Sequence, residues 1–312
     1  MPRNSFVFLI LLGTVFASLA RASQNKDPQN TDTKNAVTYQ TMFSVSISPL
    51  AFILEQLLPA EKVFVLVSAG QNPETFQAQP SQLEQLASSK YYFSLGLPIE
   101  KKIISYLNNA KEKPQIIELE TTSSTQLQSK HNHDHKGLHP WTNPLKMRQY
   151  VQAICNTLIK EKIPTETNEF TQRCIKIDEE FKILHNKLKT QLAEYKNQKF
   201  LVFHPAWSEF AALYQLEQIA VEHEGKEPSA KLLQDIAILA KQENLKYFYF
   251  QPQHSLRTAQ TLAKQLSLEL VELDPLKYNY FENMNYIARE LSEGFKKQRV
   301  SKQSKTTLNK LN

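Results

Sequence analysis

The chain has 312 residues, a formal net charge of +6 and only six glycines. This mild charge does not indicate a nucleic-acid partner, and no two glycines stand close enough to form the patterns that hold nucleotide phosphates. The G-x-S-x-G and H-E-x-x-H patterns of serine hydrolases and zinc proteases are absent as well. The length allows one large domain or two ordinary ones.

Residues 1–22 have the pattern of a secretory signal peptide. Arg3 precedes an apolar run that is interrupted and too short for a membrane span, and the small residues Ala20 and Ala22 suit a signal peptidase. Cleavage would leave Ser23 first and reduce the formal charge to +4, because two arginines and no acid are lost. The residue directly after the cleavage site is Ser23 and not cysteine, so we expect a soluble periplasmic protein without a lipid anchor.

The segment 23–36 is polar and is expected to be a flexible leader. Beyond it, runs of β-branched and aromatic residues alternate with helical periodicity, which predicts an α/β lobe over 37–164. The elements expected in this lobe are a strand at 41–47, a helix from Ser48 to about Leu58, a strand at 63–67, a helix opened by Ser81, and strands at 91–94 and 116–119.

Histidine is concentrated in the stretch HNHDHKGLHP, residues 131–140, which holds four of the eight histidines. Imidazole is a common ligand of borderline metal ions, so this stretch indicates metal capture, with a solvated loop as the alternative. His131, His133 and His135 recur at every second position within a loop placed at 121–138, and we interpret them as a mobile metal collector. His139 stands apart from them.

After this loop the pattern changes to two long helices, expected at about 143–162 and 166–196 and joined at Pro164. The second would be about 45 Å long at about 1.5 Å per residue, so the segment 165–197 could link two lobes.

The two cysteines lie on either side of Pro164. Cys155 is nine residues before it and Cys174 is ten residues after it, so an antiparallel pair of helices would place them opposite each other. In an oxidising compartment this favours a disulfide, and two buried free thiols are the alternative.

Strands and helices alternate again over 198–295, which predicts a second α/β lobe. The expected elements are strands at 200–203, 218–221, 247–250 and 269–272, and helices from Ser208, at 229–242, at 256–266 and at 280–295. The fold class is therefore α/β, with two similar lobes bridged by one long helix. The segment 296–312 has basic residues and no acid, and we expect a disordered tail rather than a contact with nucleic acid or membrane.

Several segments, in this order along the chain, resemble the metal-binding solute receptors of bacterial ABC uptake systems, the zinc and manganese cluster. Those that resemble the ligand loops of the family are SAGQNPETFQAQPSQL, LHPWTNP, FHPAWSEFA and VELDPL, and HEGKEPSA and FQPQHS are similar to segments of its zinc-type branch. The resemblance covers nearly all of the mature chain. It implies a monomeric receptor, not an enzyme, that holds a metal ion in the cleft between its lobes and delivers it to an ABC permease in the inner membrane.

Carried over position by position, the resemblance implies that His139, His204 and Asp274 are metal ligands. Glu74 stands where the family usually has histidine, so the site would contain two imidazoles and up to two carboxylates. Zinc is the expected ion on raw affinity, and manganese or iron are alternatives because carboxylates are harder ligands. His254 is expected to be structural or exposed to solvent.

Two other interpretations stay open at this point. Glu74 could act as the general base toward a metal-bound water held by His139, His204 and Asp274, which would make the protein a metal-dependent hydrolase. The protein could also sequester metal or act as an adhesin, without a permease partner.

Overall fold

The computed structural model describes most of the chain, namely residues 41–119, 138–164, 167–222 and 228–311, with side chains as far as Val300. The predicted signal peptide, the leader and the three collector histidines lie outside these residues. None of the helices in the described part combines the length and the hydropathy needed to cross a bilayer.

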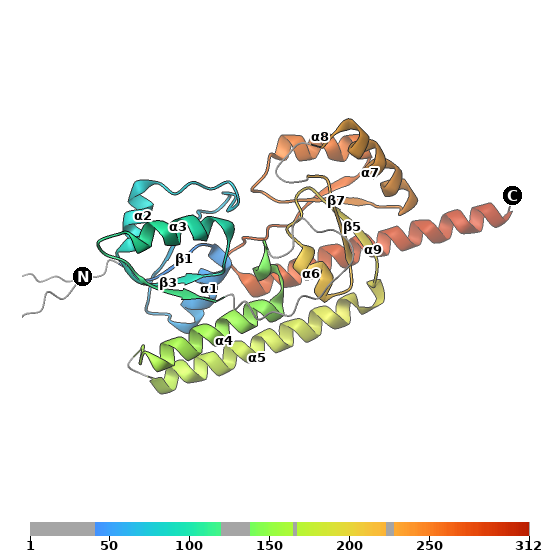
Figure 1. The fold of residues 1–312 in the computed structure, drawn as a ribbon. Helices are drawn as coiled ribbons and strands as arrows, with labels where there is room; N and C mark the ends of the chain where they lie inside the picture. The colour runs from blue at the N-terminus through green and yellow to red at the C-terminus, as the bar shows by residue number, and fades with distance from the viewer. Residues whose placement is uncertain (1–40, 120–137, 165–166, 223–227, 312) are drawn as a thin grey trace, which may run out of the picture. The chain divides into compact units, whose positions relative to one another are not determined.

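Two parallel four-stranded sheets form the centres of two lobes (Figure 1). The strands of the first sheet are β1 Thr41–Val45, β2 Val63–Val65, β3 Ser89–Ser94 and β4 Gln115–Glu118. Those of the second are β5 Lys199–Val202, β6 Glu217–Ala220, β7 Tyr247–Phe250 and β8 Glu269–Glu272. The strand order is β2-β1-β3-β4 in one sheet and β6-β5-β7-β8 in the other, so the prediction of two similar α/β lobes is confirmed.

The first lobe contains one helix that the sequence analysis did not predict. Its helices are α1 Ser48–Leu57, α2 Pro80–Ala87 and α3 Pro98–Asn108, and α3 is the additional one. Pro98 occupies its first turn, and Ile99, Ile103 and Leu107 are buried at a spacing of four residues. This periodicity is a normal helical signal in a short segment between two strands.

Two long helices follow, α4 Pro144–Lys160 and α5 Thr167–Leu192, and they run side by side (Figure 1). Short 3₁₀ turns precede α4 at Pro140–Thr142 and follow α5 at Ala193–Tyr195. Asn143 caps α4, because its side chain accepts hydrogen bonds from the backbone N–H groups of Leu145 and Lys146.

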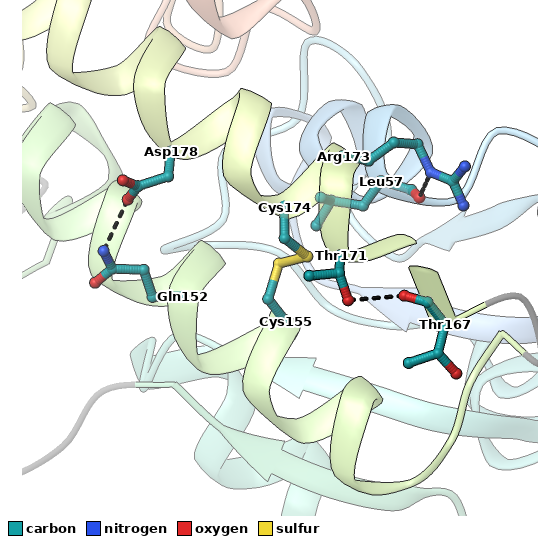
Figure 2. Close-up of a disulfide and its surroundings, with 8 residues drawn as sticks. All are labelled: Leu57, Gln152, Cys155, Thr167, Thr171, Arg173, Cys174 and Asp178. Carbon is teal, nitrogen blue, oxygen red and sulfur yellow. Dashed lines mark hydrogen bonds between the residues drawn. A yellow bond between two sulfur atoms is a disulfide. The ribbon is translucent and has the colours of Figure 1, made fainter. Parts of the chain in front are cut away.

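The pair α4 and α5 is tied by a disulfide between Cys155 and Cys174 (Figure 2). Beside it, Arg173 Nε donates a hydrogen bond to the carbonyl of Leu57 at the end of α1, over 2.7 Å. The cysteines predicted to face each other therefore do so, and α5 is held against both α4 and α1.

The second lobe contains α6 Ser208–Leu213, α7 Ala230–Gln242 and α8 Leu256–Leu266, and the described chain ends in α9 Tyr280–Leu311. Helix α9 continues through the segment that was expected to be a disordered tail. No glycine or proline follows Gly294, so no residue in this segment breaks the helix.

The hydrophobic core extends from one lobe into the other. Residues on one face of the second sheet, such as Phe200 and Tyr249, belong to the same buried cluster as Phe43 of β1, Phe181 of α5 and Phe295 of α9. The opposite face forms a separate cluster with α7 and α8. Since α9 contacts both α5 and α1, the lobes are joined by α9 as well as by the predicted linking helix.

Candidate metal centre

In the second lobe, each strand of the sheet is followed by a polar side chain close to its carboxyl end. His204 follows β5, Glu222 follows β6, Gln251 follows β7 and Asp274 follows β8. The carboxyl ends of neighbouring parallel strands meet at the same edge of a sheet, which is where ligands bind in open α/β folds. The topology therefore gathers these four residues at one edge.

The first lobe contributes Glu74 and His139 from two loops. Glu74 lies between β2 and α2, and its backbone N–H donates to Asn72 Oδ1 over 2.8 Å in a local turn. His139 immediately precedes the 3₁₀ turn, and its carbonyl accepts from the N–H and the hydroxyl of Thr142 at 3.1 and 2.9 Å. Short local hydrogen bonds thus hold the backbone of both loops.

Glu74, His139 and His204 bring three possible ligand atoms together. Glu74 Oε1 lies 3.4 Å from His139 Nε2 and 3.3 Å from His204 Nε2. The two Nε2 atoms are 3.3 Å apart. Tetrahedral zinc with ligand distances of about 2.0 to 2.1 Å has ligand-to-ligand distances of about 3.3 to 3.4 Å, so this triangle matches one face of such a site.

Asp274 is not part of this group. Its Oδ1 accepts hydrogen bonds from Gln253 Nε2 at 2.7 Å and from the N–H of Leu276 at 2.8 Å. The structure therefore brings together three of the four side chains predicted as ligands and engages the fourth in a turn beside them.

Three residues that the sequence analysis did not assign to the site surround His204. Glu222 Oε2 lies 3.0 Å from His204 Nδ1 and 3.4 Å from His254 Nδ1. The ring of His254 stacks on that of His204 with centroids 4.7 Å apart. Gln251 accepts from the N–H of His204 at 3.1 Å and donates to its carbonyl at 2.8 Å. His254 therefore lies against the site rather than in solvent. Glu222 and Gln251 each follow the end of a strand, and this position was the sequence signal that could have assigned them to the site.

The two carboxylates determine the charge of His204. Burial opposes its protonation, but hydrogen bonds to Glu222 and Glu74 outweigh burial and raise the pKa of His204 to about 9. Burial alone would raise the pKa of Glu222, but the hydrogen bond to His204 lowers it. Burial, and then the charge of His204, lower the pKa of His254. His204 is therefore protonated at neutral pH, and a metal ion must displace its Nε2 proton.

Loops of both lobes also line a small pocket at this site, with His139, His204 and His254 among its walls. Trp141, next to it, donates from its indole N–H to the carbonyl of Pro275 over 2.8 Å. Loops of two parallel α/β lobes thus place two buried imidazoles and a partly exposed carboxylate in one triangle, which is the donor set of a metal-binding site.

The comparisons with known proteins assign the family. Residues 44–294 match the family model described as Zinc-uptake complex component A periplasmic, and the chain belongs to this family. The family consists of solute-binding receptors and not enzymes, so the metal-dependent hydrolase considered from the sequence is not favoured.

Individual relatives agree with this assignment. A crystal structure of ZnuA is 27% identical with a TM-score of 0.73, and the match covers 82% of this chain and 99% of that one. A relative from Thermotoga maritima, whose name refers to metal binding, is 25% identical over 235 residues, 75% of this chain and 84% of the relative. The Zinc-binding protein AdcA of Streptococcus pyogenes serotype M3 is 30% identical over 149 residues; that match covers 47% of this chain and only 28% of AdcA.

Proposed function

We propose that the protein captures zinc in the periplasm and delivers it to an ABC permease of the inner membrane, with Glu74, His139 and His204 as ligands. The observation that carries the proposal is the triangle of ligand atoms with sides of 3.3 to 3.4 Å. Membership of a zinc-uptake family and the name of the AdcA relative support zinc as the cargo.

The composition of the site also supports zinc. Imidazole nitrogen is a borderline ligand that suits zinc, and divalent zinc binds a given nitrogen and oxygen site more tightly than manganese or iron does. Manganese and iron are the alternatives within the class, because Glu74 offers a harder oxygen ligand at the position where the family usually has a histidine nitrogen. Asp274 would be the fourth ligand after a rearrangement of its turn, and otherwise a water molecule would fill that position.

The signal peptide 1–22 directs export and is removed, and the mature protein acts as a monomer without a lipid anchor. The lobes 37–164 and 198–295 hold the ion between them, and 165–197 links them. His131, His133 and His135 collect metal for transfer to the buried site.

A titration of chelator-treated protein tests the proposal. Wild-type protein should bind one zinc ion tightly, and competition between zinc and manganese should favour zinc. The double variant His139→Ala with His204→Ala should lose the tight ion. The triple variant His131→Ala, His133→Ala and His135→Ala is the matched control, since it removes three imidazoles and should keep the ion. Tight binding by the double variant would contradict the assignment of the ligands.

Uptake and sequestration differ in their dependence on a permease. Under zinc limitation, cells that lack this protein should accumulate less zinc, and supplying the protein should restore accumulation only when the permease is present. Equal restoration without the permease would favour sequestration.

A further inference from the structure

Glu222 lies next to His204, one of the three proposed ligands, and has no part in the function proposed so far. It follows β6, its side chain is 8% exposed, and its Oε2 contacts the imidazole nitrogen of His204 that faces away from Glu74 and His139.

A carboxylate determines which ring nitrogen of a histidine can bind a metal. Ionised carboxylate oxygens only accept hydrogen bonds, so a contact at 3.0 Å requires that Nδ1 of His204 carries a proton. Nε2 is then the nitrogen left to bind metal, and it is the one 3.3 Å from both Glu74 Oε1 and His139 Nε2. The same hydrogen bond prevents the ring from rotating, and it makes Nε2 a stronger donor.

Glu222 is itself held in place. Its backbone N–H donates to the carbonyl of Phe203 over 2.8 Å, in line with the pairing of β5 and β6. His254 Nδ1 lies 3.4 Å from the same carboxylate oxygen, and the His254 ring stacks on His204. Gln251 holds the backbone of His204 through two hydrogen bonds. The strand pairing and His254 therefore restrict the carboxylate of Glu222, and Gln251 and the stacked ring of His254 restrict His204.

We propose that Glu222, supported by His254, is a positioning residue that holds His204 in the orientation and tautomer needed to bind zinc through Nε2. The inference rests on the proposed function, because it assigns Glu222 a role in the affinity of the same site. The carboxylate also supplies a second negative charge beside that of Glu74, which balances the two positive charges of the ion.

A second metal ion bound by Glu222 is the competing explanation for this cluster of side chains. His204, Glu222 and His254 each offer one ligand atom, and the three atoms lie within 4.8 Å of one another. Such an ion would need Nδ1 of His204 without its proton while Nε2 binds the first ion. The hydrogen bond to Glu222 opposes this, so the expected stoichiometry at the buried site is one.

The test compares zinc affinity in variants that all carry His131→Ala, His133→Ala and His135→Ala, so that only buried sites are counted. Glu222→Gln keeps the size and an acceptor oxygen, and Glu222→Leu removes both the charge and the acceptor. We expect affinity to fall about tenfold in the first and about a hundredfold in the second, the range found when partners of metal-binding histidines are removed. Glu217→Gln, on an exposed side chain of β6 that is 57% accessible, is the matched control and should stay within twofold of the parent.

Two further measurements separate positioning from a general loss of structure. The proton on Nδ1 of His204 in the zinc-loaded protein should change its NMR shift in Glu222→Gln and not in Glu217→Gln, and the circular dichroism of each metal-free variant should match that of the parent. His254→Phe keeps a ring against His204 and removes the nitrogen that contacts Glu222. It should weaken zinc binding less than Glu222→Leu does and leave the stoichiometry at one.

Three results would overturn the inference: affinity of Glu222→Leu within twofold of the parent, equal losses in Glu222→Gln and Glu222→Leu, or two tight ions in the parent that fall to one in His254→Phe. The failure of the proposed function is distinct, because it would show as tight zinc binding that survives the loss of His139 and His204.

Discussion

At the scale of single residues, Glu74 distinguishes this site from one made of three histidines. Its Oε1 contacts both proposed imidazole ligands, so it occupies the place that a third histidine would take. A carboxylate there adds negative charge to a buried site, and its hydrogen bond to His204 favours the protonated imidazole when no metal is bound. Metal and protons therefore compete for the same atoms.

This competition predicts release of a proton on zinc binding. With a pKa of about 9, His204 is almost fully protonated at pH 7.5, so it should release about one proton, whereas a histidine with an ordinary pKa of about 6.5 would release about a tenth. Affinity should accordingly fall by about tenfold for each unit that the pH falls below 9. Calorimetry in buffers of different ionisation enthalpy counts the protons, and release well below one at pH 7.5 would show that the pKa of His204 is not raised.

A second prediction concerns Asp274, a predicted metal ligand whose Oδ1 accepts hydrogen bonds from Gln253 and Leu276 in this structure. If Asp274 stays in this turn when zinc binds, Asp274→Asn should change zinc affinity by less than about threefold. Replacing a residue that binds the ion directly would lower the affinity far more. Glu74→Gln, measured in parallel, should weaken binding much more strongly. Equal losses in the two variants would show that Asp274 moves into the site when zinc binds.

At the scale of elements, the site depends on where strands end and on how the loops after them are held. Helices α4 and α5 form a rigid base for the first lobe, tied by Cys155 and Cys174 and by Arg173 to α1 (Figure 2). The disulfide lies between two helices and not among the ligand loops, so we expect it to affect stability more than affinity.

Replacing both cysteines by serine should lower the free energy of unfolding by about 3 kcal/mol. The disulfide joins residues 19 positions apart, and without it the unfolded chain gains conformational entropy. Urea unfolding of the metal-free protein measures this change. Wild-type protein treated with reductant should behave like the variant, and zinc affinity should stay within twofold in both. A loss of affinity comparable to the loss of stability would mean that the helix pair supports the site directly.

At the scale of the whole molecule, the two lobes share a core through α5 and α9, and loops from both meet at the metal site. Trp141 donates to the carbonyl of Pro275, and its own carbonyl accepts from the hydroxyl of Tyr280, so direct hydrogen bonds also join the lobes beside the ligands. An ion bound by Glu74, His139 and His204 would add bonds to the same junction.

Zinc should therefore stabilise the folded protein as a unit. At a free concentration one hundred times the Kd, it should add about 2.7 kcal/mol to the free energy of unfolding and raise the Tm, and chelator should reverse the change. Thermal unfolding with defined free zinc tests this. The double variant His139→Ala with His204→Ala should show no shift, and an equal shift in that variant would place the stabilising ion elsewhere.

The sequence by itself determined the alternation of strands and helices, the two lobes, the pairing of Cys155 with Cys174, and three side chains of the candidate site. Periodicity and residue type depend on local physics, so the strands, the helices and the two lobes can be predicted from short windows, whereas the three site residues followed from the resemblance to the receptor family. The tertiary structure decided which of several polar side chains at the edges of the sheets face one another. Asp274 is held by Gln253 and Leu276, while Glu222 and His254 turn toward His204. Parallel topology gathers strand ends, but the direction of each side chain follows from hydrogen bonds between loops that are distant in sequence.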